Sequence, residues 1–396
     1  MGAEVRVAGV GMVQFVTPRA GRQYEELAGE AIRSALADSG VGLEDVGQAF
    51  ASYVYGDSTC GQAALYGVGM TGIPVVNVNN NCSSGSSALW LARQAVASGE
   101  TDVALAFGFE QMQRGALVEH WADRLSPLSA SLERNIALNG APPEGTPMAA
   151  VLFGAAGQAH MERFGTSAET FARISVKARQ HAANNPLAVF RDTVTLEEVL
   201  ASPQVYGPLT RLQCCPPTSG AAATVLVSAD YAKRHGLDAK VRIAGQALTT
   251  DKPSTFEGDM RHVVGYDITA EAAQKAYAQA GIGPDDVPVV ELHDCFTANE
   301  LLSYEALGLT PEGTAEKFVL DGDNTYGGRV VTNPSGGLLS KGHPLGATGL
   351  AQCAELTWQL RGTAGDRQVE GAKVALQHNI GLGSAAVVTV YETVDR

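Results

Sequence analysis

The segment VRVAGVGM at residues 5–12 returns as VRIAGQAL at 241–248, and this repetition decides the fold class. Two more pairs follow in the same order: AIRSALADSGVGLEDV at 31–46 with AAQKAYAQAGIGPDDV at 272–287, and CSSGSSAL at 82–89 with HPLGATGL at 343–350. The offsets between paired segments are 241 − 5 = 236, 272 − 31 = 241 and 343 − 82 = 261, so they grow slowly along the chain. Two copies at such a period indicate a duplicated domain rather than a solenoid of many repeats.

Each copy has the same expected order of elements. A β-rich run opens it, and an amphipathic helix, a buried strand and a Gly- and Ala-rich helix follow. The first helix carries apolar residues at helical spacing, namely Leu27, Ala31 and Ala35 in one copy and Ala272, Ala276 and Ala280 in the other. Gly40 and Gly281 are expected to end these helices, because glycine tolerates a left-handed cap. Strands that alternate with helices predict an α/β protein.

The two copies are separated by a stretch that is richer in Pro, Asn and charged residues. We expect one helix in it, at 148–183, and GAAATVLVSAD at 220–230 then returns to an apolar strand of the first copy. The predicted parts are an N-terminal half (1–120 plus about 216–239), an inserted loop domain (121–215) and a C-terminal half (240–396).

Charge and composition argue against several classes of protein. A formal net charge of −14 without a Lys/Arg cluster disfavours nucleic acid as a partner. A membrane span needs about 18 consecutive apolar residues, and none occurs. The N-terminus has no signal-peptide pattern and the C-terminal VDR is no peroxisomal address, so we expect a cytoplasmic protein. The six cysteines lack CxxC and disulfide-framework spacing, so we expect reduced thiols.

Cys82 and His343 open the third pair of matched segments and therefore occupy matched places in the two copies. We expect each to begin a helix, where the helix dipole and free N–H groups would favour a thiolate at Cys82. A histidine nearby could take the thiol proton. The alternatives are a buried structural cysteine and a packed histidine, but the flanking NNN and SSGSS are too polar for an apolar core.

Two further clusters contain candidate site residues. His293-Asp294-Cys295-Phe296 follows the apolar run VPVVEL, and metal binding by His293 and Cys295 is disfavoured because no second ligand pair has suitable spacing. His378-Asn379-Ile380-Gly381 follows the strand KVALQ. A strand rather than a helix comes next, so we expect backbone N–H donors facing Cys82 and not a dinucleotide site. GxSxG and Walker patterns are missing from the sequence, which disfavours hydrolases and nucleotidases.

Several of these segments resemble the thiolase superfamily, and HDCF at 293–296 resembles its sterol-carrier-protein-2 type. The other segments are NNNCSSGSSAL at 79–89, GFEQM at 108–112, NPSGGLLSKGHPLGATGLAQ at 333–352 and LQHNIGLGSAAVVTVYE at 376–392. The resemblance implies a duplicated five-layer α-β-α-β-α fold with an inserted loop domain that helps to bind coenzyme A. It also implies a homodimer or a dimer of dimers.

The resemblance also implies roles for single residues. Cys82 would be the acylated nucleophile and His343 the base that activates it. Most thiolases have a second cysteine where this chain has Asn379, so Cys295 of the HDCF segment inherits its acid/base role. His293 would bind a thioester oxygen. The remaining candidates are the backbone N–H groups of Cys82 and Gly381 for an oxyanion hole, Ser335 and Gly336 for substrate binding, and His378 in a secondary role.

The implied reaction is coenzyme A-dependent cleavage of a 3-ketoacyl-CoA to acetyl-CoA or propionyl-CoA and a shortened acyl-CoA, or the reverse Claisen condensation. Coenzyme A is then a substrate, and no cofactor or metal is expected to be bound permanently. Three alternatives stay open: a retro-aldolase of sterol side chains, which normally lacks the cysteine and needs a partner protein, a ketoacyl synthase, and a non-catalytic lipid- or acyl-CoA-binding protein. The motifs do not distinguish fatty, branched and steroid acyl chains.

Overall fold

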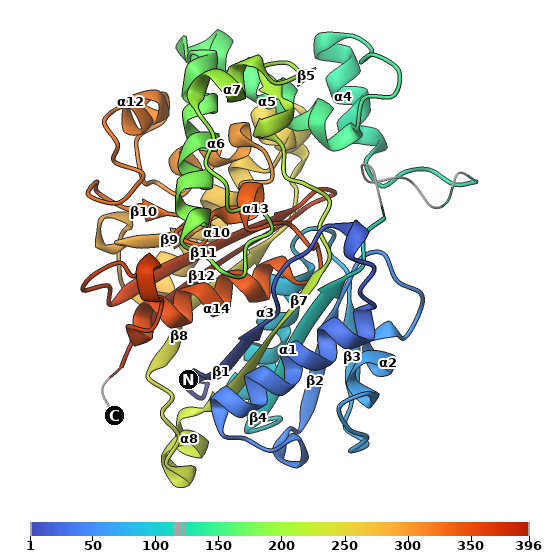
Figure 1. Cartoon of the computed structure of the whole chain (residues 1–396), viewed down its shortest axis with the longest axis vertical. Helices are drawn as coiled ribbons and strands as arrows, with labels where there is room; N and C mark the ends of the chain where they lie inside the picture. Colours follow the sequence, from blue (N-terminus) through green and yellow to red (C-terminus); the bar gives the residue numbers. More distant parts are fainter. Residues whose placement is uncertain (1, 114–120, 122, 395–396) are drawn as a thin grey trace.

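The computed structural model describes residues 2–113, 121 and 123–394, and its centre is a ten-stranded sheet (Figure 1). The strand order is β10-β9-β11-β12-β8-β1-β7-β4-β2-β3. The strands are β1 (Val5–Met12), β2 (Gln48–Ser52), β3 (Val75–Val78), β4 (Val103–Glu110), β7 (Gly220–Ser228), β8 (Val241–Thr249), β9 (Val289–Glu291), β10 (Val331–Thr332), β11 (Val374–Gly381) and β12 (Ala385–Thr393).

The sheet consists of two halves with the same topology. Read from each outer edge, β3-β2-β4-β7-β1 in the first half corresponds to β10-β9-β11-β12-β8 in the second. Parallel and antiparallel pairings also correspond: β2 is parallel to both β3 and β4, as β9 is to β10 and β11. The halves meet where β1 and β8 pair at Arg6↔Arg242 and Val7↔Val241. The duplication that the repeated segments predict is therefore present in the fold.

Helices cover the sheet halves in layers. On the outer faces, α1 (Tyr24–Ser39) packs on β1 and β7, and α10 (Tyr266–Ala280) packs on β8 and β12. In the middle, α3 (Ser84–Ala97) and α14 (Thr348–Arg361) contact each other, and α14 contacts strands of both halves. A Cβ on Gly85 would lie 2.8 Å from the carbonyl oxygen of Gly346, so glycine is needed where the two central helices begin.

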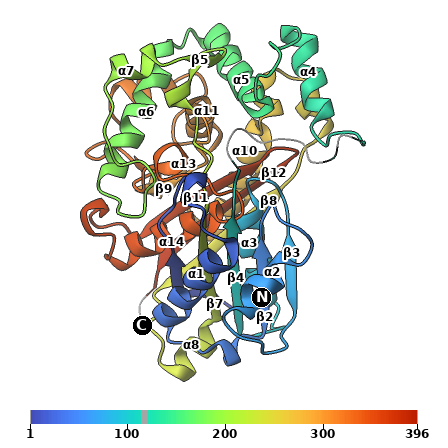
Figure 2. The ribbon, with the colours of Figure 1, turned by 45° about the vertical axis from the view of Figure 1, so that its right-hand side comes forward.

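The insertion lies over the C-terminal half (Figure 2). It contains α4 (Ser129–Asn139), α5 (Met148–Phe164), α6 (Ala168–Ala183), α7 (Leu196–Ala201), β5 (Gln204–Tyr206) and β6 (Leu209–Thr210). The single helix expected at 148–183 is wrong. It is two helices, because Gly165 adopts a left-handed cap with φ 78° and the Ser167 side chain accepts a hydrogen bond from the Thr170 N–H to start α6. The residue limits of the three predicted parts stay a prediction.

The remaining helices are short or lie in the C-terminal half. They are α2 (Cys60–Tyr66), α8 (Ala229–His235), α9 (Met260–Val263), α11 (Thr297–Ala306), α12 (Ala315–Leu320) and α13 (Gly337–Ser340). Within the described ranges, no helix combines the length and apolar character needed to cross a bilayer. Helices α5 and α6 both pack on α11, so the insertion is anchored next to the segment that follows Phe296.

Candidate active site

Cys82 lies in the turn that connects β3 to α3. Its neighbour Asn81 has φ 52°, a left-handed conformation that asparagine tolerates, and the Asn81 amide donates to the Leu382 carbonyl at 3.1 Å. The Cys82 thiol in turn donates to Oδ1 of Asn81 at 3.6 Å. The helix begins at Ser84 and not at Cys82 as expected, because the Ser83 and Ser84 hydroxyls bond back to the carbonyls of Asn80 and Asn81 and form a turn first.

His343 lies in the loop between α13 and α14, five residues before α14 rather than at its first residue. Nδ1 of His343 is 2.7 Å from the Thr348 hydroxyl, which donates its single proton to the Pro344 carbonyl at 3.0 Å. Nδ1 must therefore carry the hydrogen of that contact, and Nε2 keeps its lone pair. Nε2 is buried, and no described residue offers it a hydrogen bond. This is the tautomer that a base requires.

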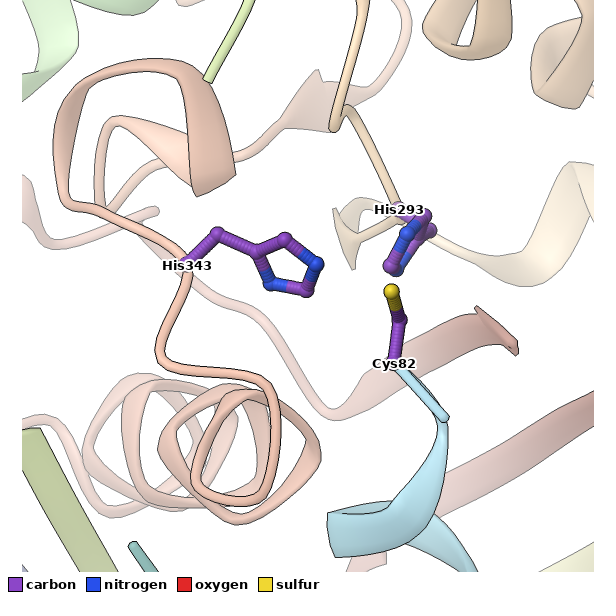
Figure 3. Close-up of side chains that lie close together, drawn as sticks. All are labelled: Cys82, His293 and His343. Carbon is purple, nitrogen blue, oxygen red and sulfur yellow. The ribbon is translucent and has the colours of Figure 1, made fainter. Parts of the chain in front are cut away.

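Cys82, His293 and His343 come together although they are far apart in the sequence. The Cys82 Sγ and one ring nitrogen of each histidine all lie within 4.8 Å of one another. The two rings are 5.1 Å apart at an interplanar angle of 83°, and the His343 ring points toward the other two side chains (Figure 3). Cys82 comes from the first half of the fold and both histidines from the second, so docking of the halves completes the site.

Burial keeps all three groups neutral. It raises the pKa of the Cys82 thiol to about 12, with a further contribution from the Glu110 carboxylate. Burial also lowers the pKa of His343 to about 3, helped by Lys341, and lowers the pKa of His293 well below its usual value. These shifts oppose the expected resting thiolate, which stays a prediction. With them, Cys82 is a neutral thiol beside a neutral imidazole, which could take the thiol proton during an attack.

This neutral state predicts how Cys82 reacts with iodoacetamide. In His343→Gln, where no base takes the proton during attack, the logarithm of the Cys82 alkylation rate should rise by about one per pH unit between about pH 6 and 9, because the thiolate fraction grows tenfold per unit below the thiol pKa. Mass spectrometry of the labelled peptide would follow the rate. A plateau near neutral pH in this variant would contradict the neutral thiol and indicate that Cys82 is already a thiolate. Acyl-CoA added beforehand should protect the residue.

Cys82 and His343 border a cavity of about 680 Å³ that is lined largely by apolar side chains of the insertion. These include Trp121, Leu125, Leu128, Met148, Phe153 and Val205. Cys295 also lines the cavity, and burial together with the thiols of Cys215 and Cys82 raises the pKa of Cys295 well above its usual value. Cys295 is therefore a protonated thiol in the resting site, the form in which a general acid is needed.

Other predicted residues lie around this centre or away from it. Gly381 ends β11 against the turn before Cys82, since a Cβ there would be 2.0 Å from the Asn80 carbonyl oxygen. His378 accepts a long hydrogen bond from the His293 N–H at 3.5 Å and contacts Thr269, so it supports the backbone of His293. Ser335 and Gly336 do not line the cavity, and Ser335 donates both its N–H and its hydroxyl to Glu291.

Two residues near the site were not predicted. Glu110, fully buried at the end of β4, accepts N–H bonds from Val54, Tyr55 and Gly346 at 3.1, 2.9 and 3.1 Å. Burial raises the pKa of Glu110 to about 7. A charged residue at the end of an apolar strand, within GFEQM, was a usable signal for it. Cys215 lines the cavity, and its N–H donates to the Cys295 carbonyl at 2.9 Å.

The same atoms would also suit a thiophilic metal ion. The sequence argument against a metal considered only His293 and Cys295, whereas the fold adds Cys82 and His343 beside His293. Cysteine and histidine are the ligands that zinc prefers. The expected lack of a metal stays a prediction.

A buried thiol beside a neutral histidine, at the edge of an apolar cavity, is typical of enzymes that form covalent intermediates through cysteine. The chain belongs to the thiolase family. Residues 5–230 match the model for "Thiolase, N-terminal domain", and residues 253–393 match that for "Thiolase C-terminal domain-like". The predicted family and fold class are confirmed, and the membership supports an acyltransferase of lipid metabolism.

The proteins similar to this chain include a sterol carrier protein, an aldolase and a thiolase. Sterol carrier protein 2 of Rattus norvegicus is 54% identical over 392 residues, which are 98% of this chain and 71% of that protein. The structure of an Ltp2–ChsH2(DUF35) aldolase matches with a TM-score of 0.81 and 26% identity over 98% of both chains. Human mitochondrial 3-ketoacyl-CoA thiolase in complex with CoA shares the fold, with a TM-score of 0.75 and 19% identity over 99% of this chain and 98% of that one.

Proposed function

We propose that the protein cleaves 3-ketoacyl-CoA with coenzyme A, giving acetyl-CoA or propionyl-CoA and a shortened acyl-CoA through an acyl-Cys82 intermediate. The observation that carries this proposal is the pairing of the Cys82 thiol with His343, whose buried Nε2 has no partner among the described residues. A thiol serves both half-reactions, because its thiolate attacks well and also leaves well. The reverse Claisen condensation uses the same groups.

The first half-reaction begins when His343 Nε2 takes the thiol proton and Sγ attacks the 3-keto carbon. The bond between C2 and C3 then breaks, and its electron pair leaves on the enolate of acetyl-CoA. Cys295 protonates that enolate and completes acetyl-CoA. In the second half-reaction, the Cys295 thiolate takes the thiol proton of free coenzyme A, whose sulfur attacks the thioester on Cys82. Cys82 leaves as thiolate and recovers its proton from His343. Hydrogen bonds to the developing oxyanion are typically worth about 3 kcal/mol each.

Cys295→Ala separates the two roles assigned to cysteine. We expect acylation of Cys82 by acyl-CoA to survive, whereas exchange of the α-protons of acetyl-CoA with deuterium should fall by about 10²–10⁴-fold, the usual contribution of a general acid or base. NMR of acetyl-CoA in deuterium oxide measures the exchange. Cys214→Ala is the matched control, since Cys214 lines the same cavity. Unchanged exchange in Cys295→Ala would move the acid/base role to another residue.

A retro-aldolase is the second candidate, because the Ltp2–ChsH2 aldolase is similar over nearly the whole chain. Retro-aldol cleavage of a 3-hydroxyacyl-CoA consumes no free coenzyme A and needs no cysteine nucleophile. The deciding experiment is an assay of 3-ketoacyl-CoA and 3-hydroxyacyl-CoA substrates of several lengths, including steroid-linked ones, with and without coenzyme A. Cleavage that requires coenzyme A supports the thiolase. Cleavage only of 3-hydroxyacyl substrates without coenzyme A would replace the proposal with the aldolase.

We further propose a homodimer or a dimer of dimers in the cytoplasm, with coenzyme A as a substrate and no permanently bound cofactor. The edge strand β3 supports the dimer, because its Val76 is partly exposed and Tyr66 and Met70 nearby are 50% and 76% exposed. An apolar edge of a sheet is a common site of pairing with a second chain.

A further inference from the structure

The side chain of Asn379 connects His293 to a buried chain of hydrogen bonds. Its Nδ2 lies 2.8 Å from Nδ1 of His293, and its Oδ1 accepts a hydrogen bond from the Ser86 hydroxyl, also at 2.8 Å. Ser86, Gln377 and Asn379 are all fully buried. Because these side chains are buried, water cannot replace their hydrogen-bond partners. The direction of each hydrogen bond in the series therefore follows from its neighbours.

The direction is set at Gln377. Its Nε2 lies 2.7 Å from the Gly349 carbonyl oxygen, which can only accept, so this end of the side chain is the NH2 group. Its Oε1 faces the Tyr391 hydroxyl, which donates to it. The second hydrogen of Nε2 points at the Ser86 oxygen, 2.8 Å away, rather than at Oε1 of Gln352, 3.4 Å away.

The Ser86 hydroxyl fixes the orientation of the Asn379 amide and thereby the tautomer of His293. Because Ser86 accepts from Gln377, its own proton is free to go to Oδ1 of Asn379, which leaves the Asn379 NH2 facing His293. Nδ1 of His293 must then accept. The ring is neutral because burial lowers its pKa, so its only proton lies on Nε2. Turning the Asn379 amide over would leave the Ser86 proton without an acceptor in a dry site.

We propose that Asn379 is a positioning residue, which holds His293 as the Nε2–H tautomer so that this ring donates a hydrogen bond to the substrate oxygen. The proposal rests on the thiolase function proposed above. Two neighbouring histidines then have opposite tautomers: Thr348 leaves His343 with a lone pair to accept the thiol proton, and Asn379 leaves His293 with an N–H to donate. The residue that stands where most thiolases have a cysteine thus acquires a different task.

The variant Asn379→Asp replaces the donor by an acceptor of the same size. Neutral His293 would then turn its proton to Nδ1 and present a lone pair to the substrate oxygen. At about pH 8 we expect kcat for thiolysis to fall by about 10²–10³-fold, the usual cost of one oxyanion donor, with a smaller change in KM. The new carboxylate raises the pKa of His293, so acid restores the Nε2–H as imidazolium, and kcat of the variant should rise as pH falls. The control is Asn139→Asp, at a solvent-exposed position that does not line the cavity. This variant should show the same pH profile as the native protein.

The tautomer is also measurable without turnover, which separates this inference from the proposed reaction. In 15N-histidine NMR of the resting protein, the signals lost in His293→Gln should show a protonated Nε2 and an unprotonated Nδ1. In Asn379→Asp the pattern should be reversed, with a protonated Nδ1 and an unprotonated Nε2. In Ser86→Ala, where the Asn379 amide is free to turn, both tautomers should appear. A protonated Nδ1 in the native protein, or native kcat and pH profile in Asn379→Asp, would overturn the proposal. Should Asn379→Asp fail to fold, the Ser86→Ala spectrum decides, and a single native tautomer there would overturn it.

Discussion

Cys82→Ala is expected to reduce coenzyme A-dependent cleavage of 3-ketoacyl-CoA by about 10⁴-fold or more, since removal of a nucleophile leaves only binding and oxyanion donors to act. No other described cysteine has two histidine nitrogens within 4.8 Å of its sulfur in a group of this kind. The decrease in absorbance of the 3-ketoacyl-CoA enolate measures the rate, and mass spectrometry of the intact protein should show an acyl adduct in the native chain and none in the variant.

The matched control is Cys60→Ala. Cys60 is also buried but begins α2, and it is not among the described residues that line the cavity. This control should keep both the activity and the adduct. Full activity of Cys82→Ala would refute the proposed function, and an adduct on Cys295 instead would exchange the roles of the two cysteines.

His343→Gln should have the second largest effect, a loss of about 10³-fold in the rate of Cys82 acylation. Glutamine fills similar space but cannot take the thiol proton, and burial holds the thiol pKa near 12, so little thiolate forms without the base. The residual rate should therefore rise about tenfold per pH unit as hydroxide replaces the base. Stopped-flow measurement of acyl-enzyme formation gives this rate.

Thr348→Val is the companion variant, because it keeps the base and removes only the group that fixes its tautomer. We expect a smaller loss of acylation rate than in His343→Gln and no steep dependence on pH. Equal losses in both variants would mean that His343 contributes through packing and not as a base.

The architecture could be predicted well from the sequence, because the residues that repeat in the two copies include those that face the core. Leu27, Ala31 and Ala35 are buried as the helical spacing requires, and Gly40 and Gly281 cap α1 and α10 with φ of 70° and 73°. Local signals that compete with helix formation were harder to read. Gly165 breaks the insertion helix, and the serine turn delays the start of α3, through hydrogen bonds that depend on one or two residues.

The candidate site was predicted in its members but not in its electrostatics. Cys82, Cys295 and His343 line one cavity, and His293 lies next to Cys82 and His343. A dipole argument predicted a thiolate at Cys82, whereas burial and Glu110 raise the pKa of this thiol, and burial by distant segments cannot be read from a local motif. Ser335 and Gly336 were chosen from their motif, yet the Glu291 carboxylate holds Ser335 away from the cavity. Cys215 had no sequence signal, because only the fold brings its segment beside Cys295.

The helix ends also correct the matched positions of the two copies. Cys82 lies two residues before α3 and His343 five residues before α14. The two residues therefore lie at different distances from the starts of equivalent helices. The offset between the helix starts is 348 − 84 = 264, against 343 − 82 = 261 for the two residues, a shift of three residues.

The junction between β1 and β8 has a consequence for the chemistry that the centre of the molecule can present. A single unit that assembled with its own copy would have a two-fold axis at this junction, and the same end of the same helix would face the centre twice. Symmetry would then force both copies to present identical chemistry. In a single chain the two units can differ in sequence, so one helix end can carry a thiol while the equivalent end carries an imidazole.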